Sequence, residues 1–134
     1  MLPDEKLKVI CQWIERAEED MRNAEHTLTL ETDCPFGTIC FHAEQCVEKY
    51  LKAFLVSQSI DFPKTHNIPE LLALVPDSVR PTLSAEEQEQ LTDYATVFRY
   101  PGDWEPITRE DAEDAVEVAR KVRESVRKRL PSCR

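Results

Sequence analysis

The prolines of this chain are placed so that long windows contain no helix-breaking residue. Nine prolines and two glycines are spread over 134 residues, and none of them lies within 4–34 or 38–59. Hairpin turns and strand bulges draw heavily on glycine, whereas a long helix needs few glycines and ends at proline. The spacing therefore argues against an all-β fold and favours long helices.

Both windows carry apolar residues at helical spacing. In 4–34 these residues recur at alternating intervals of three and four, which predicts an amphipathic helix of about seven turns. They are Leu7, Ile10, Ile14, Ala17, Met21, Ala24 and Leu28. In 38–59 a second long helix is predicted, whose wide apolar face holds Ile39, Ala43, Val47, Tyr50, Leu51, Phe54 and Leu55. Its polar arc is the first place to look for function, and it holds His42, Gln45, Glu48, Lys49 and Lys52.

The rest of the chain predicts one short helix and two longer ones. Four prolines between 61 and 81 prevent a long helix, and only 67–75 is predicted to be helical, with Asn67 as its N-cap. The next helix is expected to end near Arg99, and the last helix to continue as far as Pro131. Both begin at residue pairs with capping-box spacing, Ser84 with Glu87 and Thr108 with Asp111.

These elements predict the fold class. We expect one all-α domain over residues 1–134, an up-and-down bundle of four main helices plus one short helix. The formal charge of −9 argues against broad binding of phosphate backbones, although a local basic site is compatible with it. No apolar run reaches the roughly 20 residues of a membrane span, and no signal-peptide core follows the first charges, so a cytoplasmic protein is predicted.

The five cysteines are odd in number and include no CxxC pair. Three of them fall in apolar stretches, where a thiol packs as a small hydrophobic group. We therefore expect neither a disulfide nor a thiolate metal site.

The familiar catalytic motifs are absent from the sequence. It has no glycine-rich phosphate loop, no HExxH, no paired Cys and His at zinc spacing and no nucleophile elbow. The three histidines, His26, His42 and His66, lie on different elements, and a lone histidine on a polar helix face is ordinarily solvated. We predict no metal and no cofactor.

The charged residues of the second predicted helix allow two interpretations. Glu48 and Lys52 are one helical turn apart in the order that favours an ion pair, so they could form an ordinary solvated salt bridge. Alternatively, Lys49 or Lys52 faces a cleft and its ammonium group contacts a phosphate. The sequence leaves both interpretations open.

Residues 98–104 combine an arginine with aromatic residues at the end of a predicted helix. Arg99 lies between Phe98 and Tyr100, and Trp104 follows a turn. This composition suits stacking on a base together with a phosphate contact. It is equally compatible with a helix-terminating loop whose aromatic residues cap the core.

Five segments of the chain, taken in order, carry a family likeness. The second predicted helix contributes FHAEQCVEKYLKAFLVSQ at 41–58, and the connector contributes KTHNIPELL at 64–72. YATVFRYPGD at 94–103 and the alanine-rich DAEDAVEVARKV at 111–122 follow. The first helix supplies the pattern Ala17, Asp20 and Ala24. Together these segments resemble HEPN domains over nearly the whole chain.

The HEPN resemblance implies a cytoplasmic all-α bundle that forms a homodimer and works with a minimal nucleotidyltransferase, often as a toxin and antitoxin pair. Many proteins of the wider superfamily are metal-independent ribonucleases that use an Arg, four to six intervening residues and a His. Here no His follows Arg99, and Arg22 is separated from His26 by only three residues. Lys64, not an arginine, precedes His66. The resemblance therefore implies fold, dimer and partner more than catalysis.

Carried over by matching segment, the resemblance implies five site residues. Phosphate contacts are expected from Lys49, Lys52 and Arg99, a base or ribose contact from Tyr100, and a hydrogen bond from His66. The leading prediction is a binding protein for a nucleotide or an RNA segment that acts with a nucleotidyltransferase partner. Its rivals are a ribonuclease toxin whose divergent site combines His66 with Arg99, and a module that only docks a protein partner. Asp20 fits a structural role as well as a functional one.

Overall fold

The structure, a computed structural model, describes residues 3–97 and 106–133, and residues 94–97 as helix backbone only. Within these ranges the chain is helical and contains no strand. The elements are α1 (Pro3–Thr27), α2 (Phe36–Ser57), α3 (Ile68–Leu74), the 3-10 turn η1 (Asp77–Val79), α4 (Ala85–Val97) and α5 (Arg109–Arg127). The predicted all-α fold, with four main helices and one short helix, is confirmed.

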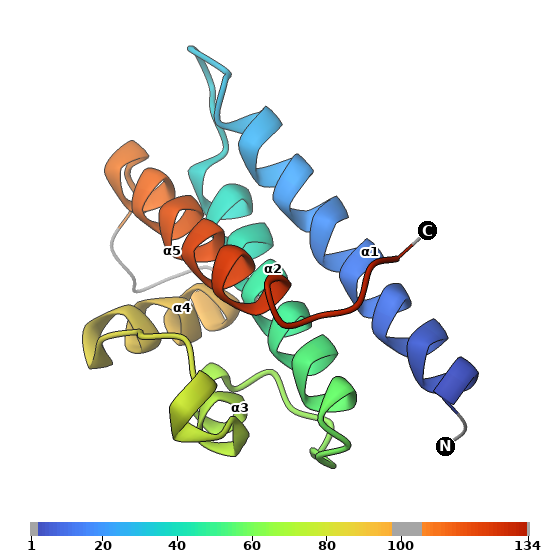
Figure 1. The fold of residues 1–134 in the computed structure, drawn as a ribbon. Coiled ribbons are helices and arrows are strands. Elements are labelled where there is room, and N and C mark those ends of the chain that lie inside the picture. Colours follow the sequence, from blue (N-terminus) through green and yellow to red (C-terminus); the bar gives the residue numbers. More distant parts are fainter. Residues whose placement is uncertain (1–2, 98–105, 134) are drawn as a thin grey trace.

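Helix α2 is the centre of the bundle. It runs antiparallel to α1, and α5 lies against it on another side, while α4 crosses at a steep angle below them (Figure 1). Helix α3 and the segments around it cover the C-terminal part of α2. This central position explains why the apolar face of α2 is wide, since it packs against several neighbours.

The helix ends follow the predicted capping residues. The Asn67 side chain accepts a hydrogen bond from the backbone N–H of Glu70 at the start of α3. Both predicted capping boxes are present, Ser84 with Glu87 and Thr108 with Asp111. Helix α5 ends at Arg127, earlier than predicted, because the chain turns there and brings Leu130 back against the core.

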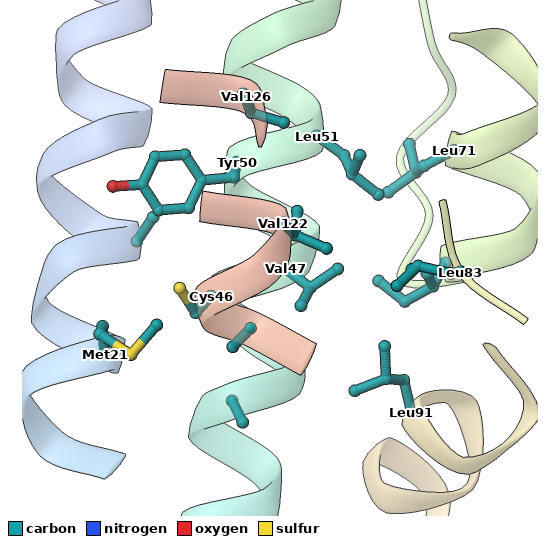
Figure 2. Close-up of a cluster of buried hydrophobic side chains, with 14 of the residues drawn as sticks. Met21, Cys46, Val47, Tyr50, Leu51, Leu71, Leu83, Leu91, Val122 and Val126 are labelled. Carbon is teal, nitrogen blue, oxygen red and sulfur yellow. The ribbon is translucent and has the colours of Figure 1, made fainter. Parts of the chain in front are cut away.

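The core is built from the predicted apolar stripes. Every apolar residue predicted on the face of α2 is buried. Figure 2 shows Val122 and Val126 of α5 over the α2 side chains, with Leu71 and Leu91 joining from α3 and α4. No helix in the described ranges is long and apolar enough to cross a membrane.

Leu7 departs from the predicted stripe of α1. Its side chain is 40% exposed, whereas Ile10 and Ile14 are buried. Helix α5 ends alongside the middle of α1 (Figure 1), where Arg127 contacts Glu18. The first turns of α1 therefore extend beyond the end of α5 and are not covered by it. A helical period identifies the apolar stripe but not how far the neighbouring helix reaches.

The prediction that no disulfide forms is wrong. Cys11 of α1 and Cys133 near the C-terminus are bonded, with their Cα atoms 5.6 Å apart. After α5 the chain crosses back to α1 (Figure 1), which joins two residues separated by 122 positions. Counting and local spacing could not show this pairing. Cys40 and Cys46 do follow the prediction, since both are buried among apolar side chains.

Candidate functional site

Asp20 of α1 is a buried carboxylate held between two basic side chains of α2. His42 Nδ1 lies 2.8 Å from its Oδ1, and Lys49 Nζ donates a hydrogen bond to its Oδ2. A buried carboxylate without partners would be costly, because it loses its hydration. The two contacts explain how the bundle accommodates Asp20 on the buried stripe between Ala17 and Ala24.

Glu48 of α2 forms a second buried contact group. His66 Nδ1, from the segment before α3, lies 2.8 Å from its Oε1. Lys52 Nζ donates to its Oε2 over 3.4 Å and also lies 5.3 Å from the centre of the Trp13 ring. The predicted ion pair between Glu48 and Lys52 is therefore present, but it is buried and not solvated.

Both histidines contact their carboxylates through Nδ1. In the neutral ring a proton on Nδ1 leaves Nε2 as an acceptor, and in the charged ring Nε2 is a donor. The His42 side chain is 26% exposed and that of His66 is 60% exposed. Each carboxylate therefore orients its histidine ring through Nδ1, and neither Nε2 atom takes part in a hydrogen bond found among the described residues.

Glu44, one turn before Glu48, is a third carboxyl group in the same region. It is fully buried, and its Oε2 accepts a hydrogen bond from Gln45 over 2.7 Å. Its Oε1 has no hydrogen-bond partner in the described part of the chain. Burial, reinforced by the nearby Glu48 and Asp20, raises the pKa of Glu44 to about 8. Glu44 therefore keeps its proton at neutral pH.

These side chains form one group, which we name the polar cluster. Its members are Asp20, His42, Glu44, Glu48, Lys49, Lys52 and His66. They come from α1, from α2 and from the segment that precedes α3.

Three of the five predicted site residues belong to the polar cluster. Lys49 keeps 20% of its side chain exposed, whereas only 8% of the Lys52 side chain is exposed. His66 is joined to Lys52 through Glu48. Arg99 and Tyr100 lie outside the described residues, so their placement stays a prediction.

The buried Glu44 and the pairing of His42 with Asp20 were not predicted from the sequence. Glu44 was not singled out, and the solvated state expected for a lone histidine is wrong for His42, which is bound to Asp20. The available signal was helical phase: Asp20 follows Ala17 by three residues and precedes Ala24 by four, which places its carboxylate on the buried stripe. A charged residue at a buried position is ordinarily paired with an opposite charge, so the position of Asp20 indicates a basic partner.

A second ionic group lies on the other side of α1, and we name it the Glu18 cluster. Arg123 donates to both carboxylate oxygens of Glu18, at 2.7 Å each, and Arg127 donates to one of them at 2.9 Å. The buried Tyr50 donates its hydroxyl hydrogen to the same carboxylate. The hydrogen bond from Arg123 is the largest cause that lowers the pKa of Glu18, to about 2. This cluster ties α1, α2 and α5 together.

Neither cluster resembles a metal centre. Among the residues that the structure describes, no group of three or more His, Cys, Asp or Glu side chains is arranged to hold a metal ion. The polar cluster instead pairs Asp20 and Glu48 with basic groups of its own chain.

Comparison with known proteins decides the family. The sequence model of the HEPN domain matches residues 10–129. This chain belongs to the HEPN family. The resemblance carried by the sequence segments is thereby confirmed, and the match includes every residue of the polar cluster.

Similar proteins are known from sequence and from structure. A protein of Methanocaldococcus jannaschii named "Putative toxin MJ1304" is 30% identical over 137 residues, which span 90% of this chain and 88% of that protein. The crystal structure of TT1696 from Thermus thermophilus is similar with a TM-score of 0.75 and 28% identity, over 90% of this chain and 98% of that one. ST0689, an archaeal HEPN homologue, shares the fold with a TM-score of 0.65 and 21% identity, over 91% of this chain and 98% of its own.

Proposed function

We propose that this HEPN protein binds a nucleotide or an RNA segment and that the polar cluster is its binding site. The observation that carries the proposal is the pairing of His42 and Lys49 with the buried Asp20, and of His66 with the buried Glu48. An ammonium group and two ring nitrogens held in this way suit phosphate and hydroxyl oxygens.

The members of the cluster have different roles in this proposal. Lys49, with the more exposed ammonium group, contacts phosphate, and the Nε2 atoms of His42 and His66 contact phosphate or ribose oxygens. Lys52 acts through Glu48, because its side chain is buried between Glu48 and the Trp13 ring.

The family resemblance extends the proposal to residues and partners beyond the cluster. Arg99 and Tyr100 are proposed to add a phosphate contact and a base or ribose contact. The protein is proposed to act as a homodimer together with a minimal nucleotidyltransferase.

The test is a titration of the purified protein with AMP and ATP, followed by amide NMR signals and calorimetry. We expect signals of His42, Lys49 and His66 to shift. Lys49→Ala should weaken binding about tenfold, the effect of losing one charged hydrogen bond. Lys8→Ala, at an exposed position of α1, is the matched control and should bind like the parent protein. Equal binding by both variants, or unmoved cluster signals at millimolar nucleotide, would reject the proposal.

A ribonuclease toxin is a second candidate, favoured by the name of the Methanocaldococcus relative and by the two histidine and carboxylate pairs. A neutral histidine bound through Nδ1 can take the proton of a ribose 2′-hydroxyl at Nε2. The 2′-oxygen then bonds to the phosphorus as the bond to the 5′-oxygen breaks, and a charged histidine gives that oxygen a proton.

Expression in a bacterial host tests this candidate. If the protein is a ribonuclease, it arrests growth and degrades labelled RNA, and His42→Ala or His66→Ala abolishes both effects. The control is His26→Ala, which alters a histidine outside the polar cluster. Normal growth with intact RNA would leave the binding function and reject the enzyme.

A further inference from the structure

The C-terminal part of α5 concentrates positive charge in an acidic chain. Residues 120–129 contain six Lys or Arg and one Glu, so this segment has a formal charge of +5 and the remaining chain −14. Cations near a helix C-terminus complement its dipole, but that effect fades within the last turn. Arg120 and Arg123 lie one to two turns before Arg127, the last residue of α5, so the dipole does not account for them.

These basic residues line a groove between α1 and α5. The groove has a volume of about 630 Å³, and Arg120, Arg123, Arg127 and Lys128 form its basic wall. Glu25 and Glu124 are the acidic residues of its lining. These lining residues carry a formal charge of 4 − 2 = +2, and the carboxylates of Glu18 and Glu117, which pair with the arginines, lie beside them.

The Glu18 cluster fixes two of these guanidinium groups. Arg123 uses Nε and Nη2 to hold Glu18, and Arg127 uses Nη1. Arg123 Nη1 and Arg127 Nη2 take part in none of the hydrogen bonds found among the described residues. Because the side chains are already ordered, a ligand that accepts from these nitrogens loses less entropy on binding.

The spacing of the basic residues matches an extended polyanion. Arg120, Arg123 and Arg127 recur at three and four residues, and a rise of 1.5 Å per residue spreads them over about 10 Å of one helix face. A single phosphate is smaller than this row. We propose that the groove between α1 and α5 binds the sugar-phosphate backbone of a nucleic-acid strand.

The groove is separate from the polar cluster. Glu18 points toward α5 and Asp20 toward α2, and residues two positions apart on a helix differ by about 200° in direction. The strand site therefore does not depend on the nucleotide site, and the two can fail independently.

The probe is a labelled single-stranded RNA of roughly 12 nucleotides, a length within the site sizes of single-strand binding proteins. The test variant is Arg120→Glu with Lys128→Glu. The control, Lys8→Glu with Arg16→Glu, changes the net charge equally at exposed positions of α1. We expect the test variant to bind at least about tenfold more weakly and to lower the slope of log K against log salt by about 1.4, between roughly 50 and 200 mM salt. The control should change binding much less.

Several results would overturn the strand site. They are absent binding by the parent protein, equal weakening in both double variants, and tripolyphosphate binding as tightly as the RNA. If the test variant fails to fold, the Arg side-chain NMR signals of the parent protein decide, since Arg123 and Arg127 should shift with RNA. Shifts on α5 alone support this site and count against the nucleotide site at Lys49. Shifts around Lys49 alone do the reverse.

Discussion

The two sides of α1 use carboxylates in opposite ways. On the side facing α5, Glu18 is saturated by Tyr50, Arg123 and Arg127, and Cys11, two turns earlier on the same side, is bonded to Cys133. On the other side, Asp20 is one of three carboxyl groups in a cluster whose histidines keep a second nitrogen for other contacts. The contacts of Glu18 hold helices together, whereas those of Asp20 and Glu48 orient the side chains of His42 and His66.

The difference is visible in the protonation of the carboxyl groups. Arginine contacts lower the pKa of Glu18 to about 2, whereas burial raises the pKa of Glu44 to about 8. The two glutamates therefore change stability in opposite directions as pH varies. Burial of a carboxylate does not by itself indicate a binding site. Glu18 joins helices through its arginine partners, whereas Asp20 and Glu48 orient histidine rings.

Glu44 should give the largest effect. Between its ordinary pKa of 4.5 and about 8, the unfolded chain has lost the proton and the folded protein keeps it. The free energy of unfolding should therefore fall as pH rises, by about 1.4 kcal/mol per unit from this group, or about 4 kcal/mol over three units. Urea unfolding at several pH values between these limits measures the slope.

Glu44→Gln isolates this contribution, since it keeps the shape and removes the titrating proton. The variant should have a shallower dependence on pH than the parent protein and should be the more stable of the two at pH near 8. Glu15→Gln, at an exposed position of α1, is the control and should leave the slope unchanged. Parallel slopes for the parent protein and Glu44→Gln would contradict the assignment.

The disulfide should have the next largest effect. It closes a loop across 122 positions, and a cross-link of that length restricts the unfolded chain strongly. Cys133→Ser should lower the free energy of unfolding by about 3 kcal/mol without reductant. A thiol reductant should lower the parent protein to the same level and leave the variant unchanged. A parent protein indifferent to reductant would show that the bond does not stabilise this side.

Removing the Glu18 carboxylate should cost about 2 kcal/mol, because it leaves Tyr50 and two arginines without their acceptor while part of the side chain is hydrated. The variant is Glu18→Gln, measured by urea unfolding at neutral pH. In the parent protein this contribution is present above pH 4.5 and is lost as pH falls toward about 2. Nucleotide binding should be unaffected, and a loss of binding would mean that the two sides of α1 are coupled.

The helices were predictable because their signals are local. The stripes through Ile14 and Val47, the N-cap Asn67 and both capping boxes depend on residues a few positions apart, and the structure confirms them. The helical position of Lys49 and Lys52 was predictable for the same reason, since one helix carries both, whereas their contact with a ligand stays a prediction. The exposure of Leu7 was not predictable, because it depends on where α5 ends.

The pairings of the site were not predictable, because they depend on how the elements pack. Asp20 and His42 are 22 positions apart, and Glu48 and His66 are 18 apart. The pairing of Cys11 with Cys133 spans almost the whole chain. The sequence shows that each of these residues is present. Only the antiparallel arrangement of α1 and α2 and the return of the C-terminus bring the partners together.

The smallest expected effect comes from an exposed ion pair on the α5 side. Arg120 bridges Glu25 at 2.8 Å and Glu117 at 3.3 Å, and all three side chains are well exposed. Arg120→Ala should therefore change the free energy of unfolding by about 0.5 kcal/mol or less. If Arg120→Ala lowers the free energy of unfolding as much as Glu18→Gln does, the exposure of an ion pair does not determine its contribution to stability. A small change would mean that the fold does not depend on Arg120, so that a loss of RNA binding on its substitution would not come from unfolding.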